Sequence, residues 1–425
     1  MDSLYYYNDI LSAKISPDFK RSLFDTINWD QKMIAIKGSR GVGKTTLLLQ
    51  RQKFGLDKKA HSLYVSMDHP YFYNRTLFDF TDEFYKLGGR FLFVDEVHKY
   101  ALWSRELKVL YDAFPELRVV FSSSSALDIY RGESDLSRRV FSYHLPGMSF
   151  REFLIFKKKV IVKAADLDHL ISGHRGFTTR LSKEKDLHIL PLFKEYLKTG
   201  YLPFSFPENE AGYSVKLNQV INTVLDIDMA YTGGYTPSTA LKLKKLLAIL
   251  AESVPFQPNI AGLSRKLNIS RDSIYTYLKY LEKAMMINTL HAKGKGISLL
   301  QKPEKIYLEN TNLSYALQLN PDIGSIRESF ILNQLINSGH KVFYPKQGDF
   351  FVDKYTIEVG GRQKPNKQVA GINHAYIAAD DILAGAGNKI PLWLFGFLYE
   401  RIYHEHHRHP YQLLSYLPPK AVVVF

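Results

Sequence analysis

The chain has 425 residues, 45% of them hydrophobic, and a formal net charge of +14 at pH 7. This length predicts two or three domains with sizeable cores, and the excess of positive charge favours anionic partners such as a nucleotide, a nucleic acid or an acidic surface. The chain has no cysteine, which excludes disulfides, zinc–thiolate sites and thiol catalysis and fits a reducing cytoplasm.

Neither the N-terminus nor the apolar runs carry a membrane signal. Residues 390–399 form one of the longest apolar runs and are too short to span a bilayer. Residues 1–14 lack the basic start and the apolar stretch of a secretion signal. We therefore expect a cytoplasmic protein with no membrane segment.

The first predicted strand and helix flank a glycine-rich loop. Residues 33–36 (MIAI) indicate a buried strand, residues 45–54 indicate a helix, and residues 38–45 between them (GSRGVGKT) fit the pattern G-x-x-x-x-G-K-[ST]. Glycines let successive backbone N–H groups point at phosphate oxygens, and the helix N-terminus adds partial positive charge. The alternative is a glycine turn that only opens a helix.

This loop predicts a nucleotide and a metal ion. We expect Lys44 to reach the β- and γ-phosphates of ATP and Thr45 to hold Mg²⁺ through its hydroxyl. The candidate nucleotide-binding residues are Gly38, Ser39, Arg40, Gly41, Val42, Gly43, Lys44, Thr45 and Thr46.

A second motif follows about fifty residues later. Besides a phosphate-binding loop, phosphoryl transfer needs a further carboxylate that holds the metal ion and a group that positions water. The apolar run 91–94 (FLFV) indicates a strand, and Asp95 and Glu96 stand at its carboxyl end. We expect Asp95 to hold Mg²⁺, mostly through water, and Glu96 to polarise the attacking water. The alternative is an acidic pair that starts a solvated loop or caps a helix.

Further strands are predicted at 61–68, 117–125 and 139–145, and helical stretches such as 104–114 separate most of them. This alternation predicts an α/β fold with a mostly parallel sheet and helices on both faces. Ser122, near the end of its strand, is a candidate sensor of the γ-phosphate, or else a plain turn or N-cap serine.

Arg138 and Arg139 precede the last of these strands. An arginine near the γ-phosphate stabilises charge in the transition state, in the same chain or from a neighbouring subunit of a homo-oligomer. Surface arginines are common, so a purely structural role is the alternative.

Several motifs occur in one order: GSRGVGKTTLLLQ, FLFVDEVHKYALWSRELKVLYD, VVFSSSSALDI, ESDLSRRVFSYHLPGMSFREFL and FKEYLKTGYLPF. Together they resemble the bacterial and archaeal AAA-type P-loop ATPases whose C-terminal half is a domain of unknown function, over roughly residues 15–400. The resemblance implies ATP binding, Mg²⁺ and slow hydrolysis. It also implies that Lys44, Thr45, Asp95 and Glu96, which match the functional positions of the family's motifs, have the same roles here. The family often has Thr-Gly-Ser-Ser where this chain has residues 122–125 (SSSS).

The resulting domain prediction has five parts. Residues 1–150 form the ATPase core, 151–235 a helical lid and linker, 236–305 a winged helix-turn-helix, 306–400 a restriction-endonuclease-like domain, and 401–425 a tail with four histidines in HEHHRH.

The winged-helix prediction rests on helical patterns at 239–254, 260–270 and 271–287 and on two strands around a glycine–lysine turn. Residues 236–305 contain twelve Lys and Arg against four Asp and Glu. On the predicted recognition helix, the candidates for contact with double-stranded DNA are Arg271, Tyr275, Tyr277 and Lys279. The alternative is a module that only packs between its neighbours.

The last folded segment resembles the PD-(D/E)xK arrangement, in which two carboxylates and a lysine bind a metal and activate water. Asp349 and Glu358 are its candidate carboxylates, with Glu328 on the preceding helix. The usual lysine position is Gly360 here, and neither Arg362 nor Lys364 is in the usual register. We therefore expect the fold without nuclease activity.

The favoured function is an Mg²⁺-dependent ATPase that couples hydrolysis to a conformational change on DNA or on a protein client. The alternatives are a nucleotide-switched DNA-binding regulator without significant turnover and an ATP-dependent metal nuclease.

Overall fold

The computed structural model describes most of the chain. The described residues are 1–57, 59–123, 136, 138–158, 160, 162–181, 187–205, 210–229, 236–252, 254–294 and 302–398. The predicted tail at 401–425 lies outside these ranges. Within them, no helix is long and apolar enough to cross a membrane.

The first part of the chain forms a five-stranded sheet in the order β2-β3-β4-β1-β5, and every pairing in it is parallel. Its strands are β1 (Met33–Lys37), β2 (Ser62–Ser66), β3 (Phe91–Asp95), β4 (Arg118–Ser123) and β5 (Phe141–His144). The predicted α/β class with a parallel sheet is confirmed. Because β4 lies between β1 and β3, its carboxyl end stands between the glycine-rich loop and Asp95.

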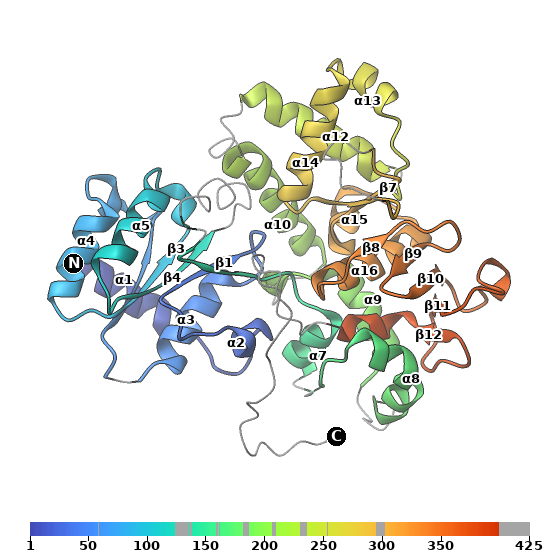
Figure 1. The fold of residues 1–425 in the computed structure, drawn as a ribbon, viewed down its shortest axis with the longest axis horizontal. Coiled ribbons are helices and arrows are strands. Elements are labelled where there is room, and N and C mark those ends of the chain that lie inside the picture. Colours follow the sequence, from blue (N-terminus) through green and yellow to red (C-terminus); the bar gives the residue numbers. More distant parts are fainter. Residues whose placement is uncertain are drawn as a thin grey trace.

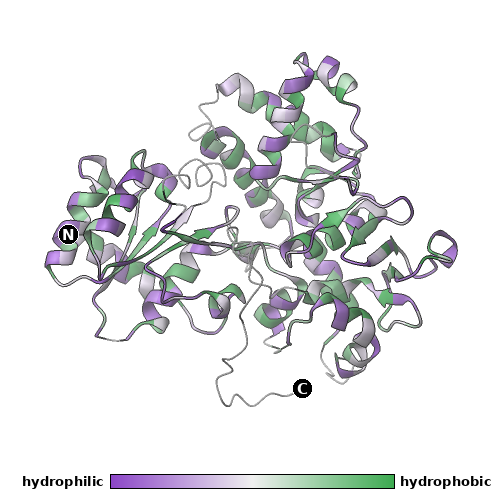
Figure 2. Ribbon diagram, viewed as in Figure 1, coloured by the Kyte–Doolittle hydropathy of each residue, from purple (hydrophilic) through white to green (hydrophobic). Residues whose placement is uncertain are grey.

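Helices cover both faces of this sheet, so its strands are apolar on both sides. In β1, Met33 and Ala35 belong to one hydrophobic core and Ile34 and Ile36 to the other. Figure 2 shows these hydrophobic strands between helices whose outer faces are largely hydrophilic. The helices of this part are α1 (Asp2–Ala13), α2 (Leu23–Thr26), α3 (Lys44–Gly55), η1 (Pro70–Tyr73), α4 (Leu77–Lys86), η2 (Val97–Lys99) and α5 (Trp103–Ala113).

The chain then crosses to the other side of the molecule (Figure 1). It forms α7 (Phe150–Lys158), α8 (Leu167–Leu181), α9 (Ile189–Thr199), η3 (Pro203–Ser205), α10 (Glu210–Thr223) and a π-helical turn, η4 (Val224–Asp228), that continues α10. Helix α7 packs against η6 (Leu392–Phe397), where the rings of Phe150 and Phe397 are 6.1 Å apart. The start of the predicted lid is thus fixed to the C-terminal end of the described chain.

Three helices and two antiparallel strands follow, in the predicted order. They are α12 (Pro237–Glu252), α13 (Ile260–Leu267), α14 (Arg271–Lys283), β6 (Ile287–Leu290) and β7 (Lys305–Leu308). Asn259 and Ser270 cap α13 and α14 by accepting hydrogen bonds from backbone N–H groups in the first turn. The assignment of this module as a winged helix-turn-helix stays a prediction.

The last part contains a mixed five-stranded sheet in the order β12-β11-β10-β9-β8. Its elements are α15 (Thr311–Leu317), α16 (Ile323–Asn337), β8 (Val342–Phe343), β9 (Phe350–Val352), β10 (Tyr355–Gly360), η5 (Asn366–Gln368), β11 (Ala375–Ala379), β12 (Lys389–Pro391) and η6. Its restriction-endonuclease-like class also stays a prediction. One contiguous core joins Ile36 of the first sheet, Phe193 of α9 and Ile357 of β10. The two sheets are therefore mechanically connected through packed side chains.

Candidate functional site

The glycine-rich loop lies between β1 and α3, as the pattern predicts. Gly43 immediately precedes α3 with φ +97°, a backbone conformation that favours glycine. A Cβ atom at Gly38 would lie 2.3 Å from the carbonyl oxygen of Leu145, so only glycine fits there. These constraints leave the loop backbone free to present its N–H groups at the start of α3.

Lys44 is buried beneath this loop. Its Nζ donates hydrogen bonds to the carbonyl oxygens of Gly38, at 3.0 Å, and Ser39, at 2.9 Å. Burial lowers the pKa of Lys44, while the nearby carboxylates of Glu96 and Asp95 oppose that shift. A buried ammonium held against the loop carbonyls is placed to meet an anion on the loop.

Three hydroxyl groups hold Asp95 at the carboxyl end of β3. The hydroxyl of Thr45 donates to Oδ2 at 2.5 Å, that of Tyr64 donates to the same oxygen at 2.8 Å, and that of Ser122 donates to Oδ1. Asp95 is only 2% exposed. Thr45 and Asp95, predicted as metal ligands from separate motifs, thus lie in direct contact. Ser122 contacts this carboxylate, and its role as a γ-phosphate sensor stays a prediction.

These oxygens fit Mg²⁺. This ion is usually held by one or two carboxylates together with substrate phosphates, and it prefers hard oxygen ligands. Across the described residues there is no cluster of three or more His, Asp or Glu side chains arranged for a metal. A site made of one carboxylate, one hydroxyl and the phosphates of a nucleotide agrees with both facts.

Glu96 has the left-handed backbone conformation, with φ +54° and ψ +41°. Such a conformation is uncommon outside glycine and clusters at functional sites. Its Oε2 lies 3.4 Å from Nε2 of His98, whose Nδ1 is 3.2 Å from the hydroxyl of Ser123. Burial lowers the pKa of His98 to about 3, so the imidazole is neutral at pH 7. A neutral, buried imidazole thus lies beside the predicted water-activating carboxylate.

His98 and Tyr64 were not among the residues singled out from the sequence. The only sequence signal for His98 is its place two residues after Glu96. Tyr64 lies on β2, where it is the register partner of Phe93, two residues before Asp95. Only the order of the strands brings it to Asp95.

The part of the chain after residue 200 reaches the glycine-rich loop at three points. A Cβ atom at Gly41 would lie 2.6 Å from the ring of Phe204, and one at Gly43 would lie 3.7 Å from Pro203. Asp228, at the end of η4, has Oδ2 3.6 Å from Nη1 of Arg40. The sequence carried no signal for Asp228, which is far from the loop along the chain.

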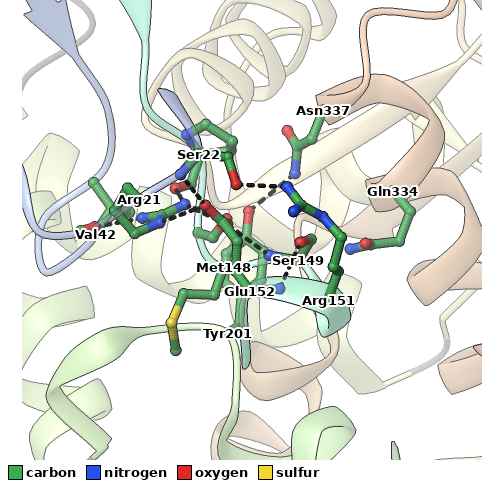
Figure 3. Close-up of polar contacts among 12 residues, drawn as sticks. Arg21, Ser22, Val42, Met148, Ser149, Arg151, Glu152, Tyr201, Gln334 and Asn337 are labelled. Atoms are coloured by element: carbon green, nitrogen blue, oxygen red, sulfur yellow. Dashed lines mark hydrogen bonds and ion pairs between the residues drawn. The ribbon is translucent and has the colours of Figure 1, made fainter. Parts of the chain in front are cut away.

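A buried arginine anchors the opposite side of the loop (Figure 3). Arg21 donates from Nη1 to the carbonyl oxygen of Val42 at 2.6 Å, and from Nη2 to those of Pro146 and Gly147. It also forms a two-pronged ion pair with Glu152 of α7, at 3.1 and 3.0 Å. Burial alone would raise the pKa of Glu152, but the charge and hydrogen bonds of Arg21 lower it.

A pocket of about 440 Å³ opens beside the loop. Its walls include Ser16, Phe19, Gly43, Thr46, Gln50 and Phe156. Gln50 donates to the carbonyl oxygens of Ser16 and Phe19, which ties α3 to the segment after α1. Since Gly43 and Thr46 belong to the predicted nucleotide-binding set, this pocket adjoins the phosphate end of the site.

Arg138 and Arg139, the candidates for charge stabilisation at the γ-phosphate, lie away from the glycine-rich loop of their own chain. Arg139 pairs with Asp112 at the end of α5, at 2.9 and 3.0 Å, and Arg138 is exposed in the turn before β5. That turn is at the amino-terminal edge of the parallel sheet, whereas the glycine-rich loop follows β1 at the carboxyl edge. This placement favours a role in a neighbouring copy over one in the same chain, and the catalytic role stays a prediction.

The carboxylates predicted for a nuclease-like site, Glu328, Asp349 and Glu358, each lie beside a lysine. Lys305 is 3.2 Å from Glu328 and 3.8 Å from Asp349, and Lys364 is 2.5 Å from Glu358. Burial raises the pKa of both Glu328 and Glu358.

Gly360, which stands at the usual position of the motif lysine, is covered by the side chain of Lys364. A Cβ atom at Gly360 would lie 2.6 Å from Cδ of Lys364, so the stem of Lys364 passes over Gly360. The ammonium of Lys364 thereby reaches Glu358 from four residues beyond the usual position.

On α14, the four residues predicted to contact DNA fall into two groups. Arg271 and Lys279 are exposed, whereas Tyr275 and Tyr277 are half-buried and pack on the core. The two charged side chains are therefore free to approach phosphates, and contact with DNA stays a prediction.

Comparison with known families agrees with this geometry. Residues 30–154 match the family model described as an AAA domain, and residues 190–322 match one described as a domain of unknown function. The first match, the five-stranded parallel sheet and the glycine-rich loop together support an AAA-type P-loop domain in the first part of the chain.

Two uncharacterized proteins of Methanocaldococcus jannaschii are similar along most of the chain. One is 26% identical over 411 residues, covering 90% of this chain and 85% of the relative. The other is 25% identical over 341 residues, covering 76% of this chain and 71% of the relative.

Solved structures align only loosely. AMPPCP-bound DnaA from Aquifex aeolicus aligns with 16% identity and a TM-score of 0.23, over 61% of this chain and 84% of that chain. A structure titled for katanin self-assembly aligns with 16% identity and a TM-score of 0.25, over 48% of this chain and 74% of that chain. At these scores the alignments support no conclusion about fold or function.

Proposed function

We propose that this protein binds ATP with Mg²⁺ and hydrolyses it, and that hydrolysis drives a movement of its C-terminal half on DNA or on a protein client. The observation that carries the proposal is the contact between the Thr45 hydroxyl and the Asp95 carboxylate at 2.5 Å, beside the buried Lys44. Residues of two separate motifs, with predicted roles in phosphate and Mg²⁺ binding, thus meet at one edge of the sheet.

The residues at this edge offer suitable surroundings for the adenosine, the phosphates and the metal ion of Mg²⁺–ATP. The pocket beside Gly43 and Thr46 suits the adenosine, with Phe19 and Phe156 as apolar walls. The loop N–H groups and Lys44 suit the phosphates. Mg²⁺ bound by Thr45 and Asp95 would neutralise charge that develops on the transferred phosphoryl group.

The chain's own residues supply the remaining steps. Glu96 would position a water molecule, since its left-handed backbone places its side chain at the carboxyl end of β3, beside the buried His98. Ser122 and Tyr64 keep Asp95 in place through hydrogen bonds. An arginine from a neighbouring copy, Arg138 or Arg139, would complete the charge stabilisation.

Turnover of purified wild-type protein tests the proposal. We expect Lys44→Ala to abolish nucleotide binding and Glu96→Gln to bind ATP while losing at least about a hundredfold in turnover. The matched controls are Lys86→Ala and Glu116→Gln, exposed side chains in surface ion pairs, and both are expected to turn over at the wild-type rate. Turnover that survives Lys44→Ala would overturn the proposal.

A second candidate is a nucleotide-switched regulator that binds DNA, favoured by the exposed Arg271 and Lys279 on the strongly basic α12–α14 module. The same assay with duplex DNA separates the two functions. DNA that raises turnover indicates a DNA-coupled ATPase, and tight ATP and DNA binding without turnover indicates the regulator. Turnover indifferent to DNA at low salt indicates a protein client.

A further inference from the structure

Asp228 is a carboxylate from the C-terminal half that stands inside the phosphate site of the N-terminal half. It is 2% exposed and lies 3.6 Å from Arg40, 4.0 Å from Lys99 and 4.0 Å from His98. Its charge also acts on Lys44. Arg40 belongs to the glycine-rich loop, and Lys99 follows Glu96 by three residues. Asp228 is thus close to the cations that a triphosphate would need.

The γ-phosphate of ATP brings further negative charge to these same cations. Two anions close together in a site that excludes water repel each other strongly, because the effective dielectric constant there is low. A diphosphate ends one phosphoryl group earlier and leaves the contact between Asp228 and Arg40 undisturbed. The carboxylate therefore opposes a triphosphate more than a diphosphate.

We propose that Asp228 is a specificity-determining residue that competes with the γ-phosphate for Arg40 and Lys99, so that ATP, but not ADP, displaces the end of α10. This inference rests on the proposed ATP-binding function. The backbone at this point is a π-helical turn, a feature that recurs at functional sites and that re-aims the side chains at the end of a helix.

The surroundings of Asp228 show how its displacement would reach the rest of the chain. Two residues earlier, Asp226 is 2.6 Å from Lys244 of α12, the first helix of the basic module. At the other end of α10, the hydroxyl of Tyr213 donates to Asn312 at 2.6 Å, and its ring contacts Phe204, which lies over Gly41. Displacement of Asp228 would therefore act on α10 and α12 together.

Equilibrium binding of ADP and of a non-hydrolysable ATP analogue tests this proposal on the full chain. We expect Asp228→Asn to tighten binding of the triphosphate by about tenfold and to change ADP binding by less than about twofold. Glu210→Gln removes a carboxylate charge from an exposed position at the other end of α10 and is expected to change the affinity for neither nucleotide. Equal effects on both nucleotides, or weaker triphosphate binding, would overturn the proposal.

Hydrogen exchange provides a second measurement. In the wild type, the triphosphate analogue is expected to speed amide exchange in residues 210–228, whereas ADP is not. In Asp228→Asn this difference between the nucleotides is expected to disappear, and its persistence would contradict the role given to Asp228.

Two further outcomes are informative. Asp228→Ser removes the charge with a smaller side chain, and unfolding of both Asp228 variants would assign the residue a structural role and overturn the proposal. If the wild type binds neither nucleotide, the proposed ATP function fails, and this inference fails with it. If the wild type binds both nucleotides and Asp228→Asn behaves like it, only the inference fails.

Discussion

The guanidinium of Arg21 contacts both carboxylate oxygens of Glu152, at 3.1 and 3.0 Å, and both side chains are almost fully buried. Through the same guanidinium, the carbonyl oxygen of Val42 in the glycine-rich loop is joined to α7. Helix α7 in turn packs on η6, so this ion pair links the predicted nucleotide site to the C-terminal half. The pair is a fixed anchor of the loop, whereas Asp228 is the contact that we propose ATP displaces.

Glu152→Gln should strongly destabilise the chain, because Arg21 would keep its buried charge without a compensating carboxylate. Breaking one side of a buried pair costs on the order of 3–5 kcal/mol. Urea denaturation measures the free energy of unfolding, and Glu210→Gln, which breaks an exposed pair with Lys198, serves as the control with an expected cost below about 1 kcal/mol. A similar small cost for Glu152→Gln would show that the pair does not anchor the loop.

Tyr64→Phe should weaken Mg²⁺ binding without unfolding the sheet. The hydroxyl of Tyr64 donates to the Asp95 oxygen that also accepts from Thr45, so its loss leaves the carboxylate less firmly oriented. Loss of such a partner of a metal ligand typically costs about ten- to a hundredfold in metal affinity or activity. Turnover as a function of Mg²⁺ concentration in the presence of ATP measures the effect, with Tyr73→Phe, an exposed side chain of η1, as the control. A wild-type Mg²⁺ dependence would assign Tyr64 to packing alone.

The positions of the local parts of the candidate site could be predicted from the sequence, because each part depends on residues close together in the chain. The glycine-rich loop, Lys44, Thr45 and the pair Asp95–Glu96 are each framed by an apolar strand and a turn, and those local signals place them at the carboxyl edge of a parallel sheet. The order of the strands then brings the two motifs into contact.

The contributions from distant elements could not be predicted in this way. Asp228 lies near the loop at the end of the π-helical turn that continues α10, and Lys364 reaches Glu358 because Gly360 leaves room for its stem. Arg21 shows the same limit, since its partners lie at Val42 and at residues 146–152. Such contacts depend on tertiary packing rather than on periodicity or spacing.

Glu309 should make stability depend on pH near neutrality. Burial raises its pKa to about 7, although Tyr201, Asn310 and Asn333 donate hydrogen bonds to the carboxylate. Because the folded pKa lies above the unfolded one, the favourable contribution is fully present below about pH 4.5 and is lost as the pH rises through about 7. The total is on the order of 3 kcal/mol.

Glu309→Gln stays neutral at every pH and should keep that contribution. The free energy of unfolding of the variant, minus that of the wild type, is therefore expected to rise between pH 5 and about pH 7.5 and then to level off. Glu304→Gln, on the exposed surface, is the control and should show no such rise. A constant difference across this range would mean that Glu309 is ionised in the folded chain at all these pH values.

The carboxylates near the second sheet should not support metal-dependent cleavage of DNA. Lys305 already pairs with Glu328 and Asp349, and Lys364 pairs with Glu358, so their ammonium groups lie against oxygens that a metal ion would use. Incubation of the protein with duplex DNA and Mg²⁺ or Mn²⁺ is therefore expected to leave the DNA intact, with or without ATP. Cleavage that disappears in Glu358→Gln and persists in Glu304→Gln would contradict this expectation, since it would show that Lys364 acts as the displaced motif lysine and that the centre binds metal.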